Sequence, residues 1–406
     1  MKRVWYKWTP CIFRVAWIYT VFRWFGTLGV IYISYGISWI LTGAAFYICV
    51  GGILHKYIKK EEQHMLYKNV EIFNAAELIH NDDGSVTWLR VPETVFQTME
   101  SKSANEVAHN VTGVELRFVI KGESVKLLMN ASKDDDTGFC TFHVYYGGVQ
   151  GGWEDHEVHK HITAEVQEFE IKRPKNMKNL EKMTAMSGWD WDPQVVRVIF
   201  DRGRVNLHGV IGDVELPKPS QCPRKTLLCY GSSITHGSNS IDMSHAWASV
   251  LGYNLNMDVR NLGMAGSCCM EPAMADYLAA EGERGKWDVA VLELGINVLG
   301  WEEEKICDRV DNILQQVAGR NPEKPIFVVS PFYYGGEDLR DSVTGQKWRR
   351  LIAQIIARRA DPNVTYINGL EVLDHIRYMS ADEIHPNIYG QQRIAEVLTQ
   401  KLMQAL

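Results

Sequence analysis

The chain has few cysteines for its length. Its 406 residues include eight cysteines, and these form neither a Cys-x-x-Cys pair nor a Cys/His cluster of zinc type. The pattern therefore excludes a disulfide-stapled scaffold and implies no metal. Reduced thiols are the expectation, and nothing in the sequence implies a cofactor.

Basic runs are missing from the chain beyond its first sixty residues. The formal net charge is −6 at pH 7, so nucleic acid is not an expected partner. Internal repeats and low-complexity tracts are also missing. The length favours two globular domains over one.

The first sixty residues contain no Asp or Glu but hold five of the thirteen tryptophans. Residues 24–54 carry no charge, and about 20 apolar residues suffice to span a bilayer. The excess of basic residues before this stretch favours a cytoplasmic N-terminus. Without a clear cleavage site, a signal peptide is disfavoured. Two explanations of residues 1–64 stay open. One is a membrane anchor with the catalytic domain outside, and the other is a mis-called start, with a cytoplasmic protein beginning at Met65.

Short alternating runs predict an all-β domain over residues 65–217. Val114–Ile120 and Thr141–Tyr145 alternate apolar and polar side chains, as half-buried strands do. Arg197–Phe200 and Val205–Gly209 flank a four-residue turn signal and predict a hairpin. Many short strands are typical of a sandwich or jelly roll. The flat faces of such a domain also suggest a homo-oligomer.

Strands alternate with helical patterns over residues 218–406. The predicted later strands and helices are Pro325–Ser330, Asn363–Ile367, Cys307–Ala318, Gln346–Arg359 and Gln391–Leu406. This alternation predicts an α/β domain with a doubly wound parallel sheet of flavodoxin-like type.

Polar or small residues follow the predicted strands where ligands bind in open α/β sheets. Ser233 comes just after the apolar run Leu227–Gly231, and Asn297 follows the run Asp288–Leu294. Gly266 lies in a stretch of small residues that lets a backbone N–H approach a ligand. Taken alone, each of these is equally an ordinary cap or turn.

A carboxylate and a histidine stand close together near the end of the chain. Asp382 precedes His385 by three residues, so its carboxylate can reach the imidazole if the segment turns tightly. Pro386 blocks a helix at His385 and starts one after it.

Together these blocks resemble the SGNH (GDSL-type) hydrolase superfamily, in the same order along residues 225–400. The resemblance implies Ser233 as the nucleophile, His385 as its base and Asp382 as the carboxylate that orients His385. It also implies an oxyanion hole formed by the Ser233 N–H, the Gly266 N–H and the Asn297 side-chain amide.

The chain departs from this family at one position of the first block. Ser232 stands where the family has aspartate, which puts rate and substrate preference in question. Glu293 lies in an apolar run, so we expect it to find a hydrogen-bonding partner near the site. His236 is expected in the pocket wall.

A sandwich or jelly-roll domain before such a hydrolase domain resembles bacterial carbohydrate esterases. The resemblance implies a serine esterase acting on short acyl esters, above all O-acetyl groups of carbohydrates, with a small-molecule or oligosaccharide ester as substrate. Two alternatives stay open. One is a lipase or lysophospholipase, at a membrane if residues 24–54 are an anchor. The other is a non-catalytic carbohydrate-binding protein on a hydrolase scaffold.

Overall fold

The computed structural model describes residues 65–132, 139–152, 158–339 and 342–406. The apolar segment 24–54 lies outside these ranges. Among the helices that are described, none combines the length and the apolar character needed to cross a bilayer.

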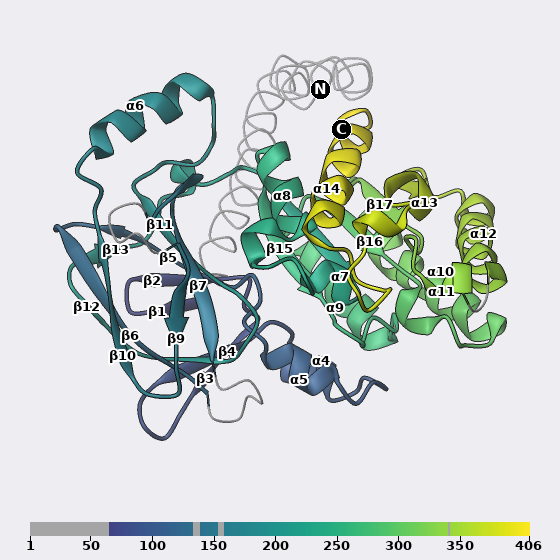
Figure 1. Cartoon of the computed structure of the whole chain (residues 1–406), viewed down its shortest axis with the longest axis horizontal. Helices are drawn as coiled ribbons and strands as arrows, with labels where there is room; N and C mark the ends of the chain where they lie inside the picture. The colour runs from purple at the N-terminus through teal and green to yellow at the C-terminus, as the bar shows by residue number, and fades with distance from the viewer. Residues whose placement is uncertain (1–64, 133–138, 153–157, 340–341) are drawn as a thin grey trace, which may run out of the picture. The chain divides into compact units, whose positions relative to one another are not determined.

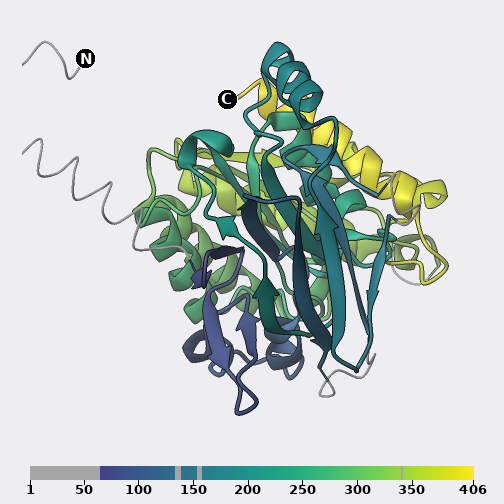
Figure 2. The same ribbon diagram turned by 90° about the vertical axis from the view of Figure 1, so that its left-hand side faces the viewer.

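Two antiparallel sheets form the first part of the described chain (Figure 1; Figure 2 shows their strands face-on). One has the order β1–β2–β5–β11–β7–β8, with β13 also on β5 and β9 also on β7. Its strands are Met65–Tyr67 (β1), Val70–Phe73 (β2), Glu115–Ile120 (β5), Cys140–Tyr146 (β7), Val149–Gln150 (β8), Lys160–Ile162 (β9), Val195–Phe200 (β11) and Val214–Glu215 (β13). The other has the order β10–β6–β12–β4–β3. Its strands are Glu77–His80 (β3), Val86–Leu89 (β4), Ser124–Ala131 (β6), Gln167–Lys172 (β10) and Val205–Ile211 (β12).

The two sheets share one apolar core, as the alternating pattern predicts. Leu116 and Phe118 of β5 are fully buried and belong to the same cluster as Leu127 and Met129 of β6. Side chains of successive strand residues point to opposite faces, so these alternate positions face the other sheet. The predicted sandwich is confirmed.

Two details of this region differ from the prediction. Three helices interrupt the strands: Glu93–Phe96 (α4), Ala104–His109 (α5) and Met177–Ser187 (α6). The hairpin predicted across residues 201–204 is also wrong, because β11 and β12 belong to different sheets. Asp201 does not close a tight turn; its buried carboxylate accepts hydrogen bonds from Thr141 and from the Met243 N–H.

A five-stranded parallel sheet forms the second part, in the order β15–β14–β16–β17–β18. The strands are Thr226–Gly231 (β14), Asp258–Gly263 (β15), Val289–Glu293 (β16), Ile326–Val329 (β17) and Val364–Ile367 (β18). The longer helices are Trp247–Leu255 (α8), Pro272–Glu283 (α9), Glu303–Arg320 (α10), Ser342–Arg359 (α12) and Ile388–Met403 (α14). Shorter helices and 3₁₀ turns are Pro219–Gln221 (η2), Ser233–His236 (α7), Met243–His245 (η3), Ile296–Val298 (η4), Gly336–Leu339 (α11), Gly369–Val372 (α13) and Ile376–Tyr378 (η5).

Helices cover both faces of this sheet. In β14, Leu228 and Tyr230 pack in one core with residues of α9, α10 and α12, whereas Leu227 and Cys229 pack with α8 and α14. Helices α8 and α14 lie side by side (Figure 1). This is the predicted flavodoxin-like arrangement, and it leaves the carboxyl ends of the strands as the place for a site.

A buried ion pair joins the antiparallel and parallel sheets within one compact unit, His64–Leu406. The Arg117 guanidinium donates to both carboxylate oxygens of Asp258, at 2.6 and 2.7 Å, and to Glu115 at 2.7 Å. Burial acts to raise the pKa of Glu115, but Arg117 and Arg197 outweigh it and lower the pKa to about 2. Loss of one partner would leave a buried charge uncompensated, which typically costs about 3–5 kcal/mol.

Candidate active site

Ser233 is the first residue of α7, directly after β14. Ser232 caps this helix, because its backbone is extended and its Oγ accepts a hydrogen bond from the Ile234 N–H at 3.1 Å. A Cβ at Gly231 would lie 2.2 Å from Thr235 Oγ1, so only glycine fits there. The short turn thus fixes Ser233 at the carboxyl edge of the sheet.

The structure brings together Ser233, His385 and Asp382. The Oγ of Ser233 lies 2.7 Å from His385 Nε2. On the other side of the ring, His385 Nδ1 lies 2.8 Å from Asp382 Oδ2. The side chains of His385 and Asp382 are 23% and 41% exposed, so the three residues lie at the surface.

The tight turn needed between Asp382 and His385 is present. Asp382 Oδ1 accepts hydrogen bonds from the N–H groups of Ile384 and His385, at 3.0 and 2.8 Å, and Glu383 has a φ of +66°. Burial acts to raise the pKa of Asp382, but these hydrogen bonds and the His385 ring outweigh it and lower the pKa to about 2. Asp382 is therefore ionised at neutral pH.

Asn239 is a further contact of Asp382 that the sequence did not indicate. Its side-chain amide donates to Asp382 Oδ2 at 2.9 Å. Asn239 belongs to the loop 237–242 between α7 and η3, so the segment that follows Ser233 helps to hold the Asp382 carboxylate.

Gly266 and Asn297 also lie after strands of the parallel sheet. Gly266, in the turn after β15, has a φ of +66°, which favours glycine. Asn297, in η4 after β16, accepts a hydrogen bond from the Cys268 N–H through Oδ1 at 3.1 Å. Because this contact fixes the orientation of the side-chain oxygen, it also fixes that of the Asn297 NH₂ group, which can donate to a different acceptor.

Two serines from the antiparallel part contact the Gly266 turn. The hydroxyls of Ser101 and Ser103, between α4 and α5, lie 2.9 and 2.8 Å from Ser267 Oγ. Ser101 also donates to the Gly266 carbonyl at 3.4 Å. Nothing in the local sequence marks these residues, since their partners are more than 160 residues away.

Arg90 links the same strand end to the antiparallel part. Its buried guanidinium donates to the carbonyls of Asn261 and Gly263 in β15, each at 3.1 Å, and to those of Asn110 and Val107. Burial lowers the pKa of Arg90 to about 9, so it stays cationic at neutral pH.

His236 does not lie in the pocket wall, contrary to the sequence-based expectation. It is 2% exposed, and its Nε2 lies 3.4 Å from Arg90 Nη2. Burial, with the nearby cations Arg90 and Arg202, places the pKa of His236 well below its usual range. His236 therefore packs as a neutral core residue and has no access to Ser233.

Glu293 has the hydrogen-bonding partners that its burial predicts. Its Oε2 accepts from the Ser232 N–H at 2.7 Å, from the Ser232 hydroxyl at 2.7 Å and from Thr235 Oγ1 at 3.0 Å. The side chain is fully buried, and burial outweighs these bonds to raise the pKa of Glu293 to about 7. A carboxylate thus reaches the nucleophile turn from β16, and Ser232 donates to it.

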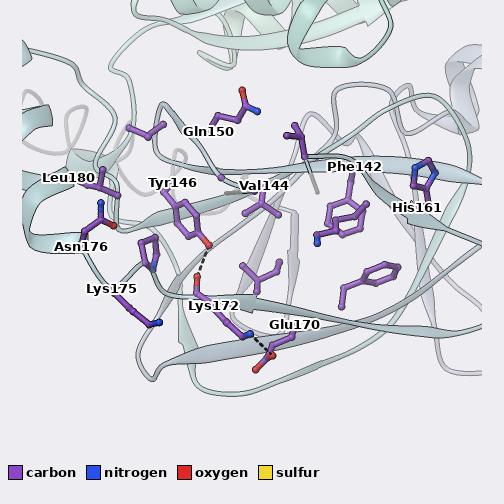
Figure 3. Close-up of a pocket in the computed structure, with 18 of the residues that line it drawn as sticks. Phe142, Val144, Tyr146, Gln150, His161, Glu170, Lys172, Lys175, Asn176 and Leu180 are labelled. Carbon is purple, nitrogen blue, oxygen red and sulfur yellow. Dashed lines mark hydrogen bonds and ion pairs between the residues drawn. The ribbon is translucent and has the colours of Figure 1, made fainter. Parts of the chain in front are cut away.

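A cavity of about 900 Å³ lies in the antiparallel part, and its lining residues are all between Phe142 and Leu180. Figure 3 shows Phe142, Val144 and Tyr146 of β7 lining it, with Lys172 and Glu170 of β10 opposite. It contains neither Ser233 nor His385, so it is not the site of chemistry at Ser233.

A family model matches the second part of this chain, and several solved structures share its fold. A family model for the GDSL-like Lipase/Acylhydrolase family matches residues 229–393. No curated protein matches the chain. The salicylyl-acyltransferase SsfX3 from a tetracycline biosynthetic pathway is 16% identical, with a TM-score of 0.67 over 84% of this chain and 96% of that one.

Carbohydrate esterases share the fold as well. A family two carbohydrate esterase from Cellvibrio japonicus is 14% identical, with a TM-score of 0.55 over 83% of this chain and 95% of that one. One from Clostridium thermocellum, in complex with cellohexaose, is 15% identical, with a TM-score of 0.54 over 82% and 98%. Residues 229–393 therefore form a GDSL-like lipase/acylhydrolase domain, and this domain supports an esterase activity.

Proposed function

We propose that the protein is a serine esterase that removes short acyl groups, chiefly O-acetyl groups, from carbohydrates. The observation that supports this most directly is the chain of contacts from Ser233 Oγ to His385 Nε2, 2.7 Å, and from His385 Nδ1 to Asp382, 2.8 Å. Nucleophile, base and orienting carboxylate stand in the order that acyl transfer requires.

In the first step, Ser233 Oγ attacks the ester carbonyl while His385 Nε2 accepts its proton. Ionised Asp382 stabilises the imidazolium that forms. The tetrahedral intermediate then expels the sugar alcohol, which takes the proton from His385 and leaves an acyl-enzyme. A water molecule, deprotonated by His385, attacks this ester; collapse of the second intermediate releases the carboxylic acid and returns the proton to Ser233.

The negative charge on each tetrahedral intermediate needs donors fixed in advance. We assign them to the Ser233 N–H, the Gly266 N–H and the Asn297 side-chain NH₂. The contact from the Cys268 N–H to Asn297 and the serine contacts of the Gly266 turn support this assignment. One such donor is typically worth about 100- to 1,000-fold in turnover.

The exposure of the site leaves room for a large polar substrate. His385 is 23% and Asp382 41% exposed, so an oligosaccharide can approach Ser233 from solvent. The fold shared with family two carbohydrate esterases, one of them bound to cellohexaose, agrees with this substrate class.

The first experiment compares p-nitrophenyl acetate hydrolysis by the wild type and Ser233→Ala. We expect the variant to lose nearly all activity, while Ser124→Ala, at a half-buried serine on β6 of the antiparallel part, keeps it. Equal rates for wild type and Ser233→Ala would refute the nucleophile.

A second experiment separates the substrate classes. Acetate release from acetylated xylo-oligosaccharides, with rates falling steeply from p-nitrophenyl acetate to the octanoate, supports the carbohydrate esterase. Preference for long chains would point to the lipase alternative. Oligosaccharide binding without ester hydrolysis would point to the non-catalytic alternative.

A further inference from the structure

Three side chains from separate segments converge beside β7. His143 belongs to β7, His159 precedes β9, and Asp242 precedes η3. One potential ligand atom from each lies within 4.8 Å of the other two. The two imidazole rings meet edge to face at 4.6 Å, and His159 Nε2 lies 3.2 Å from Asp242 Oδ2.

Two of the three side chains are withdrawn from water. His143 is 1% and Asp242 4% exposed. A buried carboxylate is costly unless it is paired or coordinates a metal. The imidazole rings of His143 and His159 supply nitrogen atoms of the kind that first-row metal ions take as ligands.

Outer hydrogen bonds fix the members of this cluster. His143 Nε2 lies 2.9 Å from Asp201, and this carboxylate is itself bound by the Met243 N–H at 2.6 Å. Asp242 Oδ1 accepts from Ser244 Oγ at 2.6 Å and lies 2.8 Å from His245 Nδ1. Metal-binding imidazoles and carboxylates are typically oriented by such partners.

The backbone before Asp242 is strained. Ile241 has a φ of +75° although it is β-branched and 70% exposed. Such a conformation persists only where the surroundings fix it. Here the strained residue leads directly into the buried carboxylate of the cluster.

We propose that His143, His159 and Asp242 bind a zinc ion, with water in the fourth position. Two imidazoles and a carboxylate are a common zinc ligand set. With metal–ligand bonds of about 2.0–2.1 Å, tetrahedral ligand atoms lie roughly 3.4 Å apart. His159, whose side chain is 35% exposed, has room to close the remaining gap.

The ion would act on the proposed esterase through the loop that follows α7. Asn239 in this loop donates to Asp382 at 2.9 Å, and Asp242 lies three residues further on. A zinc ion at Asp242 therefore fixes the loop that holds Asp382. It is a positioning element and takes no part in the chemistry.

For the test, the full chain is dialysed against EDTA and Zn²⁺ is then titrated into it. Calorimetry measures the binding, and the melting temperature measures the gain in stability. We expect one zinc per chain and a rise in melting temperature. His159→Gln, at a half-exposed position, is expected to weaken the zinc Kd at least tenfold. His208→Gln is the matched control, because this half-buried histidine lies on β12, in the antiparallel sheet that does not contain β7, and hydrogen-bonds to Asn130 of the neighbouring strand β6.

Two results would overturn the proposal: no zinc binding by the wild type, or unchanged binding by His159→Gln. If zinc bound at Ser233, His385 and Asp382 instead, His159→Gln would bind it as the wild type does, and His385→Gln would not bind it. Since the readout is binding and not turnover, failure of the proposed esterase activity would leave this test valid.

Discussion

Replacing Glu293 by glutamine removes one buried charge beneath the nucleophile turn and keeps the shape of the side chain. The amide oxygen can accept the hydrogen bonds that Oε2 accepts from Ser232 and Thr235. The NH₂ group then takes the place of Oε1, which has no hydrogen-bond partner among the described residues. The variant therefore imitates the protonated form of Glu293.

The size of the expected change in the free energy of unfolding follows from the pKa of Glu293. Burial raises the pKa of Glu293 from 4.5 to about 7, so between these values the folded state binds a proton that the unfolded state has lost. The resulting stability is fully present below pH 4.5 and is lost as pH rises through about 7. A difference of this size corresponds to about 3 kcal/mol at most.

Urea unfolding of the wild type and Glu293→Gln at pH 5, 6.5 and 8 measures this effect. We expect the free energy of unfolding of the wild type to fall by about 1–3 kcal/mol relative to the variant between pH 5 and 8. Parallel curves for the two proteins would refute the raised pKa. Glu371→Gln, an exposed residue of α13 paired with Lys401, is the control and should leave the pH dependence unchanged.

Three further predictions concern the residues around Ser233. Asn297→Ala should lower kcat on p-nitrophenyl acetate about 100- to 1,000-fold with a smaller change in KM, because the lost donor acts on the oxyanion; an unchanged kcat would remove Asn297 from the oxyanion hole. Arg90→Lys should lower the melting temperature measured by calorimetry, because one ammonium group cannot reach four carbonyls and each buried group left unpaired costs about 1–3 kcal/mol; a wild-type melting temperature would contradict this. Ser232→Asp should destabilise the fold increasingly above pH 7 in urea unfolding, because it sets a second carboxylate against Glu293; added stability there would contradict it.

Much of the fold follows from local patterns in the sequence. Strands such as β14 and β16 are buried on both faces, so they read as continuous apolar runs. The helix predicted at Cys307–Ala318 extends in fact over Glu303–Arg320, because its ends are polar and interrupt the apolar spacing that marks its middle.

The contacts among Ser233, His385 and Asp382 were predictable because these residues lie in short motifs whose local geometry is fixed. The Asp382–His385 turn needs only four residues, and the Ser233 turn needs only a strand end and a cap. Arg90, Ser103 and Asn239 carry no such local signal. Their partners lie far away in the sequence. The packing of the antiparallel part against the parallel sheet brings Arg90 and Ser103 to the site, and the fold of the second part brings Asn239 to Asp382.

Ser232 stands where the family has aspartate, and Glu293, which is distant in the sequence, supplies a carboxyl group beside it. An aspartate at position 232 would put its carboxylate where the Ser232 hydroxyl now donates to Glu293 at 2.7 Å. Two buried carboxylates at that distance repel one another, so one of them would have to bind a proton. With serine, the one carboxyl group at this place is that of Glu293 in β16, and the Ser232 hydroxyl still caps α7 through the Ile234 N–H. The carboxyl group beside the turn at Ser233 is thus supplied by Glu293, so positions 232 and 293 should be exchanged together. Urea unfolding should show that Ser232→Asp combined with Glu293→Ser is more stable than either single variant. A double variant no more stable than Ser232→Asp alone would show that the two positions are not coupled.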